Sequence, residues 1–115
     1  MSYMLLIVEP QHQRRTRSPD QGRGVYQRML DYTESLKAKG VLLASNSLRE
    51  AAVRLNVRAG KPSLVDGPFT ESKEFIGGFF LLDCGTREQA LAFAGQCPAA
   101  EWASIEVREV GPCYE

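Results

Sequence analysis

Two long apolar runs dominate the hydrophobic pattern of the chain, and both have the length of a β-strand. Residues 3–9 read Tyr-Met-Leu-Leu-Ile-Val-Glu, and residues 75–84 are apolar or glycine at almost every position. Apolar side chains at consecutive positions, rather than at alternate ones, are typical of a strand that is covered on both faces. Both runs are therefore predicted to be central strands of a sheet.

Two other segments carry the signals of amphipathic helices. Residues 18–21 supply an N-cap serine, a proline at the first helical position and a capping-box glutamine, and Gly40 stands where a left-handed C-cap is expected. Residues 86–89 form a second capping box, and Pro98 ends that segment. The apolar stripes of the two predicted helices are Val25, Met29, Tyr32 and Leu36 in the first, and Ala90, Phe93, Ala94 and Cys97 in the second.

Shorter strand patterns fill the rest of the chain and define a fold class. Strands are predicted at residues 41–45, 53–58, 62–65 and 103–110, with a turn at residues 59–61 and alternating apolar and polar positions in 53–58. The order is then strand, helix, strand, hairpin, strand, helix, strand. This is the split βαβ pattern of the ferredoxin-like fold, an α+β arrangement with two helices on one face of an antiparallel sheet.

Such a sheet has a second face that its own helices do not cover. Because the two central runs are apolar at consecutive positions, this second face is predicted to be apolar as well, and a large apolar face is rarely left in water. A second copy of the same chain, related by a two-fold axis, is the simplest cover. We therefore expect a homodimer in which the two sheets face each other.

Composition and charge are those of an ordinary globular protein. The chain has 115 residues, of which 43% are hydrophobic and 24% are charged, and this length fits a single domain spanning residues 1–115. Fourteen basic side chains balance fourteen acidic ones. Without an excess of positive charge, neither nucleic acid nor an anionic membrane surface is expected as a partner.

The sequence predicts neither a metal site nor a bound cofactor. The three cysteines lack a Cys-x-x-Cys spacing and are accompanied by one histidine, so a zinc site is not expected, and no nucleotide-binding fingerprint is present. The apolar run at residues 3–8 has no basic flank and is too short for a signal peptide or a membrane span. The expected location is therefore the cytoplasm.

The segment at residues 66–74, Asp-Gly-Pro-Phe-Thr-Glu-Ser-Lys-Glu, is the motif most indicative of function. Asp-Gly-Pro favours a tight turn, and the polar residues that follow do not belong in a core. The glycine pair at residues 77–78, at the entrance of the second apolar run, permits another group to approach the backbone closely. Together these features predict a built site.

This segment resembles the signature of the DGPF branch of the YCII-related family, whose members carry a similar Asp-Gly-Pro-Phe-x-Glu-x-Lys-Glu run followed by Gly-Gly and a strand. Residues 104–108, Ser-Ile-Glu-Val-Arg, are similar to the Glu-Val-Arg segment with which these proteins close, although Glu109 stands where a proline commonly follows. The resemblance implies a dimeric α+β barrel with clefts between the sheets.

The resemblance does not carry over a complete catalytic set. Enzymes of the wider YCII group use a histidine on the first helix paired with an aspartate, whereas the first helix predicted here offers Met29 and Tyr32 and no histidine. Whether the chain is an enzyme is therefore left open. If it is one, cofactor-free acid–base chemistry of a lyase-like kind is expected.

Asp66 and Glu106 are the candidate acid–base residues. Asp66 either accepts backbone N–H bonds as the first residue of its turn or faces a cleft as a general base. Glu106 and Arg108 share one face of the last strand, opposite Ile105 and Val107, which are assigned to the helix-covered side. Arg108 is suited to hold a carboxylate or phosphate, and an internal Arg–Glu pair is the alternative.

Lys73, Glu74 and Ser45 complete the candidate ligand-binding residues. Lys73 lies between Glu71 and Glu74, so it could hold an anion or belong to a solvated loop of surface ion pairs. Ser45, at the end of its predicted strand, could add a hydrogen bond to the same cleft as Arg108 or cap a turn. His12 and the arginines nearby are interpreted as parts of a solvated loop.

Two functions fit these residues. The first is binding or transformation of a small polar or aromatic molecule in a cleft at the dimer interface, without a metal or nucleotide cofactor. The alternative is a non-catalytic regulatory module that contacts a protein, since genes for DGPF proteins are often found beside those for extracytoplasmic-function sigma factors. A pocket would need Asp66, Glu106 and Arg108 to converge, whereas a partner surface would need exposed apolar residues such as Phe69 and Phe75.

Overall fold

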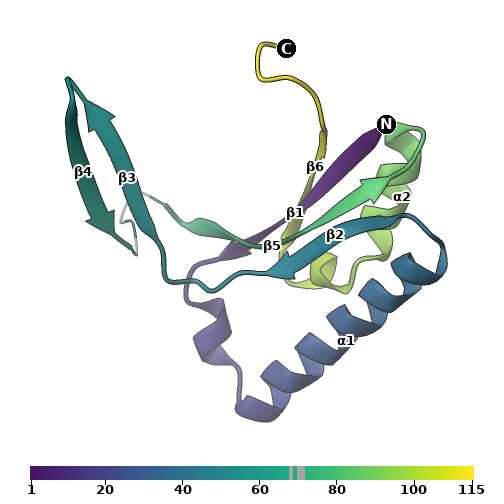
Figure 1. Ribbon diagram of the computed structural model, residues 1–115. Helices are drawn as coiled ribbons and strands as arrows, with labels where there is room; N and C mark the ends of the chain where they lie inside the picture. The colour runs from purple at the N-terminus through teal and green to yellow at the C-terminus, as the bar shows by residue number, and fades with distance from the viewer. Residues whose placement is uncertain (68, 70–71) are drawn as a thin grey trace.

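The computed structural model describes residues 1–67, 69 and 72–115 of the chain. Its centre is an antiparallel sheet of four strands in the order β2-β5-β1-β6 (Figure 1). These strands are β1 (Ser2–Pro10), β2 (Leu42–Ser47), β5 (Glu74–Asp83) and β6 (Ser104–Glu109). The helices α1 (Pro19–Ala38) and α2 (Arg87–Gln96) lie on one side of the sheet, and the short 3-10 helices η1 (Gln13–Thr16) and η2 (Pro98–Glu101) flank them.

This arrangement confirms the predicted fold class. The elements β1, α1 and β2 form one half of a split βαβ pattern, and β5, α2 and β6 form the other. The two long apolar runs are β1 and β5, and they take the two central places in the sheet. The chain therefore has the ferredoxin-like α+β fold of the dimeric α+β barrel type.

The helix α1 begins as the sequence predicts and packs on the sheet mainly near its end. The Ser18 hydroxyl accepts a hydrogen bond from the Gln21 backbone N–H at 3.2 Å, and the Ser18 N–H donates to the Gln21 side chain at 2.9 Å. Tyr32 and Leu36 are buried, whereas Tyr26 in the first half of the helix is 55% exposed. Within the described residues no helix is long and apolar enough to cross a membrane.

The two faces of the sheet are both apolar but differ in how they are covered. On the helix-facing side, Leu5 of β1 and Leu82 of β5 are fully buried together with Leu36 of α1. The opposite side, called the open face below, has no helix over it (Figure 1). The apolar residues of β1 and β5 on the open face are Met4, Leu6, Val8, Phe79 and Leu81, all partly exposed, and Ile76, which pairs with Val8 and is 47% exposed.

The strands β3 (Val53–Arg58) and β4 (Lys61–Asp66) form a separate hairpin that stands away from the main sheet (Figure 1). Its turn is made by Ala59 and Gly60, which have left-handed φ values of 50° and 75°. The sequence predicts that residues 53–58 are half-exposed, but both faces of the hairpin are exposed because it does not pack on the sheet of its own chain.

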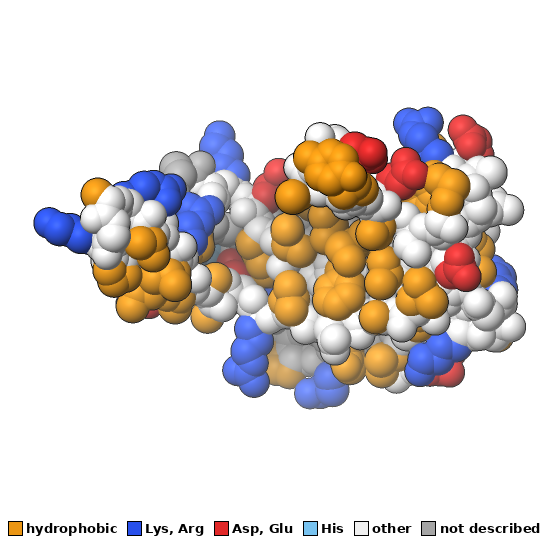
Figure 2. Space-filling view, turned by 45° about the horizontal axis from the view of Figure 1, so that its top comes forward, with side chains coloured by type: hydrophobic (Ala, Val, Ile, Leu, Met, Phe, Trp, Pro, Cys, Tyr) orange, Lys and Arg blue, Asp and Glu red, His pale blue; other side chains and the backbone are white. Residues whose placement is uncertain are grey.

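The hairpin is nevertheless amphipathic, because paired residues on antiparallel strands share a face. One face is apolar and the other carries Arg54, Arg58 and Lys61. Apolar side chains gather on the hairpin as well as on the main body in the space-filling view (Figure 2). The apolar hairpin face consists of Val53, Leu55, Val57, Pro62 and Leu64, and Asp66, which pairs with Val53, lies at the end of the same face.

Candidate functional site

A cleft of about 610 Å³ opens between the first half of α1 and the helix-facing side of the sheet. It exists because α1 packs closely through Tyr32 and Leu36 near its end, while its first half leaves the sheet uncovered. The lining combines apolar side chains with polar ones. They include Ile7, Met29 and Phe80 among the apolar residues and Glu9, Arg17 and Ser45 among the polar ones.

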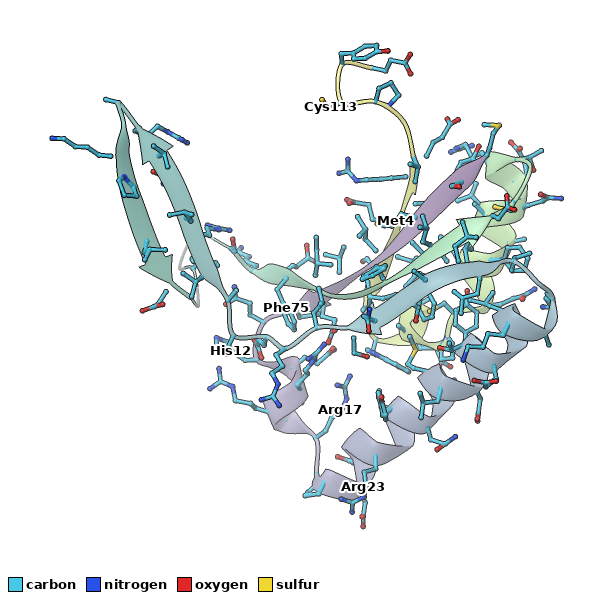
Figure 3. All side chains as sticks on the ribbon, viewed as in Figure 1. Met4, His12, Arg17, Arg23, Phe75 and Cys113 are labelled. Carbon is cyan, nitrogen blue, oxygen red and sulfur yellow. The ribbon has the colours of Figure 1, made fainter. Side chains whose placement is uncertain are left out.

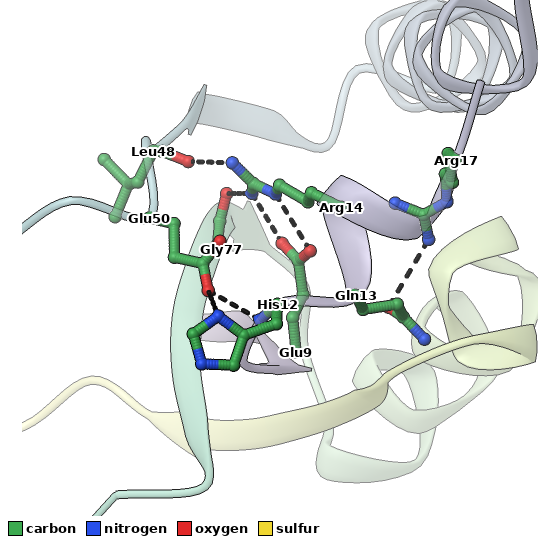
Figure 4. Close-up of polar contacts among 8 residues, drawn as sticks. All are labelled: Glu9, His12, Gln13, Arg14, Arg17, Leu48, Glu50 and Gly77. Carbon is green, nitrogen blue, oxygen red and sulfur yellow. Dashed lines mark hydrogen bonds and ion pairs between the residues drawn. The ribbon is translucent and has the colours of Figure 1, made fainter. Parts of the chain in front are cut away.

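A buried carboxylate, Glu9, belongs to this lining and is held by Arg14 (Figure 4). Glu9 is 5% exposed, and its two carboxylate oxygens accept hydrogen bonds from Arg14 Nε at 3.0 Å and Nη2 at 2.6 Å. Glu9 continues the alternation of Leu5 and Ile7 on β1, so its carboxylate points to the buried, helix-facing side of the sheet. The bidentate arginine compensates for the lost hydration of that charge.

Arg14 also ties together segments that are far apart in the sequence. Its Nη1 donates to the Leu48 carbonyl at 2.7 Å, and its Nη2 donates to the Gly77 carbonyl at 3.1 Å. Its guanidinium lies 5.0 Å from the centre of the Phe75 ring, a cation–π distance. Arg14 is therefore committed to the structure of the cleft and has little capacity left for a ligand.

A β-bulge in β5 explains the first glycine of the Gly-Gly pair. Ile7 of β1 pairs with Gly78, but its neighbour Val8 pairs with Ile76, so Gly77 is the extra residue. A bulged residue has no partner in the ladder and leaves its backbone groups available for other bonds.

The bulge places the backbone of Gly77 against the buried ion pair. Its carbonyl accepts from the Leu48 backbone N–H at 2.8 Å as well as from Arg14. A Cβ atom at this position would overlap the Glu9 carboxylate. The close backbone approach predicted for the Gly-Gly pair is thus confirmed, and the group that approaches is a side chain of the chain itself.

Arg17 is the other charged residue in the lining. Its Nη2 is 3.4 Å from Gln13 Oε1, the limit of a hydrogen bond (Figure 4). Its guanidinium lies 5.6 Å from the centre of the Trp102 ring. Gln13 in turn donates to the Trp102 carbonyl at 2.9 Å. Arg17 is therefore oriented by weak contacts while most of its N–H groups stay available.

Ser45 lies in the cleft because of a second irregularity, in β2. The register shifts between Leu42 and Ala44, so Ser45 pairs with Phe80 on the helix-facing side. A shift of one residue moves every later side chain to the other face of a strand. Ser45 and the open-face residue Arg108 are thus on opposite sides of the sheet, and the structure does not bring them into one cleft.

Glu106 and Arg108 lie on the open face and bind each other. Arg108 Nε donates to Glu106 Oε2 at 3.1 Å, and the two side chains are 67% and 49% exposed for Arg108 and Glu106 respectively. Ile105 and Val107 pack against the core, as predicted from the alternation of β6. The internal pair foreseen as an alternative for Arg108 is therefore present.

The remaining candidate residues lie near the hairpin. Asp66 is the last residue of β4 and is exposed. Lys73, just before β5, and Glu74, its first residue, are exposed as well. None of these three side chains belongs to the lining of the cleft. The signature positions Pro68, Thr70 and Glu71 lie outside the residues that the structure describes.

The aromatic residues of the signature are covered by arginines. The guanidinium of Arg54 lies 3.7 Å from the centre of the Phe69 ring, and that of Arg14 lies over Phe75. Both rings are half-buried. They do not form the exposed apolar surface that a protein-binding module would present.

His12 lies before η1 and is not part of the cleft. It adopts a left-handed φ of 70°, and its backbone N–H donates to Glu50 Oε1 at 2.7 Å. Its ring contacts Arg15 and is solvent-exposed. On α1 the position facing Phe80 is taken by Tyr32, whose hydroxyl donates to the Phe93 carbonyl at 2.7 Å, and burial strongly raises its pKa.

The two buried cysteines, Cys84 and Cys97, do not supply a reactive thiolate. Cys84 and Cys97 are buried and free, and Cys113 is exposed and free. Burial raises the pKa of the Cys84 and Cys97 thiols, so both remain protonated near neutral pH. They act as small core residues, as the sequence indicates.

Sequence analysis missed the Glu9–Arg14 pair and the role of Arg17. One signal was present, because a carboxylate that continues the buried register of a strand requires a cation nearby. The arginines at residues 14, 15 and 17 follow directly, and a charged partner five residues away could have been inferred. Nothing local indicates which of the three arginines turns inward.

Comparison with known proteins connects the chain to one family. A family model described as the YCII-related domain matches residues 1–113. An uncharacterised protein of Rhizobium meliloti (strain 1021) is 48% identical over 60 residues, which cover 50% of this chain and 48% of that protein. The match thus spans about half the length of this curated relative.

A solved structure shares the fold at low sequence identity. It is 5-chloro-2-hydroxyhydroquinone dehydrochlorinase (TftG) from Burkholderia phenoliruptrix AC1100, in a complex with 2,5-dihydroxybenzoquinone. The superposition has a TM-score of 0.58 and 16% identity and covers 96% of this chain and 94% of that one. At this identity the likeness shows the fold.

Proposed function

The chain belongs to the YCII-related family, and from this premise we propose that it binds a small organic molecule in the cleft between α1 and the sheet and acts on it there. The observation that carries the proposal is the cleft itself, which is about 610 Å³ in volume and combines apolar walls with a few convergent polar groups. This volume and lining are typical of small-molecule sites. A dehydrochlorinase of the same fold, solved with a dihydroxybenzoquinone, supports this class of ligand.

The polar groups of the cleft are suited to acid–base chemistry. The Glu9 carboxylate, the Tyr26 phenol and the Ser45 hydroxyl all belong to its lining. Each can donate or accept a proton or a hydrogen bond, and Glu9 is fixed in position by Arg14. These residues are better placed for such a role than Asp66 and Glu106, which would need a second copy of the chain to be enclosed.

The proposal is tested by blocking the cleft at a glycine. Gly22 belongs to the lining and Gly24 does not, and a Cβ atom at either position meets nothing within 4 Å. Both lie in α1, where replacing glycine favours the helix. We expect compounds from a library of hydroxylated and carboxylated benzenes, naphthalenes and quinones to raise the Tm of wild type and Gly24→Phe, and to have no effect on Gly22→Phe.

Two results would contradict the proposal. Equal stabilisation of all three proteins would place the ligand outside the cleft. If no compound in the library stabilised the wild type, the cleft would not be a site for this class of molecule. Circular dichroism of both variants serves as the control for folding.

We also propose that two copies of the chain associate through the open face and the apolar hairpin face. Six apolar residues of β1 and β5 that are at least partly exposed line the open face, and Leu55 and Leu64 of the hairpin are 63% and 70% exposed. Light scattering is expected to give twice the chain's 12.8 kDa. A mass of one chain at every concentration would rule this association out.

A further inference from the structure

The charges that line the cleft do not cancel. Glu9 and Arg14 neutralise each other in their bidentate pair. Arg17 then contributes one positive charge, and within the part of the chain that the structure describes it has no acidic partner. A half-buried guanidinium beside apolar walls loses hydration, so an anion that enters the cleft would be favoured there over a neutral molecule.

Arg17 is held in position by contacts that leave most of its N–H groups free to donate to a ligand. Its guanidinium lies over the Trp102 ring at a cation–π distance, and its long contact with Gln13 leaves its other N–H groups for a ligand. Arg28 lies 5.5 Å from the centre of the same Trp102 ring but is paired with Glu101 on the surface. Arg17 lies between η1 and α1, and its planar fork matches a carboxylate (Figure 3).

The rest of the lining is suited to a flat ring. Val25 and Met29 present partly exposed apolar surfaces, whereas Ile7 and Phe80 are only 4% exposed, and the thioether of a methionine packs readily against aromatic rings. Ser45 adds a hydroxyl that can bind a polar ring substituent. One guanidinium matches one carboxylate, whereas a phosphate would bring additional negative charge for which the lining has no second uncommitted cation.

We infer that the ligand of this cleft is a planar aromatic carboxylate whose anionic group binds Arg17 and whose ring packs on Val25 and Met29, an inference that rests on the proposed function. Arg17 is then the residue that selects an acid over its neutral analogue. The established structural pair of Glu9 and Arg14 takes no part in this selection.

The test compares 2-naphthoate with its neutral isostere 2-naphthamide by isothermal titration calorimetry. Wild type is expected to bind 2-naphthoate at least tenfold more tightly than 2-naphthamide. Arg17→Gln is expected to lose that preference through weaker binding of the acid, and Arg17→Lys to retain part of it because the charge stays while the fork is lost. Arg15→Gln is the matched control, since Arg15 is an exposed arginine of η1, two residues before Arg17, and lies outside the lining.

The outcomes separate this inference from the proposed function. If the acid and the amide bind wild type equally, and Gly22→Phe blocks both, the cleft is a ligand site but the inferred class is wrong. If the acid is preferred and Arg17→Gln keeps the preference, Arg17 is not the selecting residue and the inference is overturned. If neither probe binds and the wider library yields only neutral ligands of the cleft, the inferred class is wrong. If no compound in the library binds, the proposed function is contradicted, and the inference that rests on it is overturned with it.

Discussion

The cleft beside α1 and the β3–β4 hairpin are both left uncovered by the chain, but they are built in opposite ways. In the cleft, Glu9 is 5% exposed and both of its carboxylate oxygens accept hydrogen bonds from Arg14. Arg14 also donates to two backbone carbonyls of other segments. On the hairpin, residues of both strands are exposed and the apolar ones gather on one face. The first arrangement is a preorganised concave site, and the second is a flat surface that requires a large partner.

The hairpin also shows why this difference has energetic consequences. A two-stranded ribbon alone is at best marginally stable in water. Near its base the hairpin is held by a hydrogen bond from the Gly67 N–H to the Ala52 carbonyl at 2.8 Å and by the contact between Arg54 and Phe69. The cleft is enclosed by contacts within one chain, whereas the apolar hairpin face has no cover among the described residues of its own chain.

The largest effect is expected where the cleft is most tightly built, at Gly77. Gly77→Val places a side chain on the Glu9 carboxylate and separates it from Arg14. Breaking a buried ion pair and leaving one charge unpaired costs about 3 kcal/mol or more. Urea unfolding measures the loss, and Gly95→Ala in α2, where a Cβ atom meets nothing within 4 Å, is the control that should not destabilise. A loss below about 1 kcal/mol would show that the pair can move without cost.

A smaller effect is expected at Tyr32, where α1 closes on the sheet. Tyr32→Phe removes the hydrogen bond to the Phe93 carbonyl and should lower the free energy of unfolding by about 1 kcal/mol near neutral pH. Burial raises the pKa of Tyr32, so the wild-type contribution is fully present below pH 10. It is lost as the pH rises from there toward the folded-state pKa, because the unfolded tyrosine ionises first.

Urea unfolding of both proteins between pH 8 and pH 11 tests the Tyr32 prediction. The stability of wild type should fall toward that of Tyr32→Phe above pH 10. A constant difference between the two curves over this range would mean that Tyr32 ionises as easily in the folded protein as in the unfolded chain.

The hairpin is tested by charging its two faces in turn. Leu55 and Asn56 are neighbours on β3 that point to opposite faces, and both are exposed. Leu55→Glu should raise the dimer dissociation constant at least tenfold, with little effect on the stability of the single chain, and Asn56→Glu should leave it unchanged. Sedimentation velocity over a range of concentrations distinguishes them. Equal effects of both substitutions would mean that the apolar face is not the contact surface.

The smallest effect is expected for the exposed pair on the open face. Arg108→Ala removes an ion pair whose partners are 67% and 49% exposed, and surface pairs of this kind contribute about 0.5 kcal/mol or less. The change in urea midpoint should be close to the error of the measurement. A loss of more than about 1 kcal/mol would indicate that the pair is enclosed in solution by a second copy.

The elements of the fold could be predicted from the sequence because their signals are local. The capping box of Ser18 and Gln21, the stop at Pro98 and the alternation of β6 each lie within a few residues. The apolar runs of β1 and β5 identified the central strands for the same reason. These signals agree with one another, which is the condition for a reliable inference of topology.

The cleft could not be predicted because it depends on irregularities and on distant contacts. Ser45 is expected in the same cleft as Arg108 or as a turn cap because it ends its predicted strand, but the register shift after Leu42 places it on the other face of the sheet. Likewise, no local pattern shows that Arg14 reaches back to Glu9 and across to Gly77. The positive charge that Arg17 contributes to the cleft can therefore be recognised from the structure but not from the sequence.

The central position of β1 has a consequence for folding during protein synthesis. Among the strands of the sheet, β1 is translated before its two neighbours, β5 and β6, which follow about seventy and one hundred residues later. During synthesis on the ribosome, β1 therefore has no neighbouring strand to pair with until β5 has been translated. An unpaired strand of this kind is prone to aggregation, so this interval is the one in which a nascent chain would depend most on chaperones.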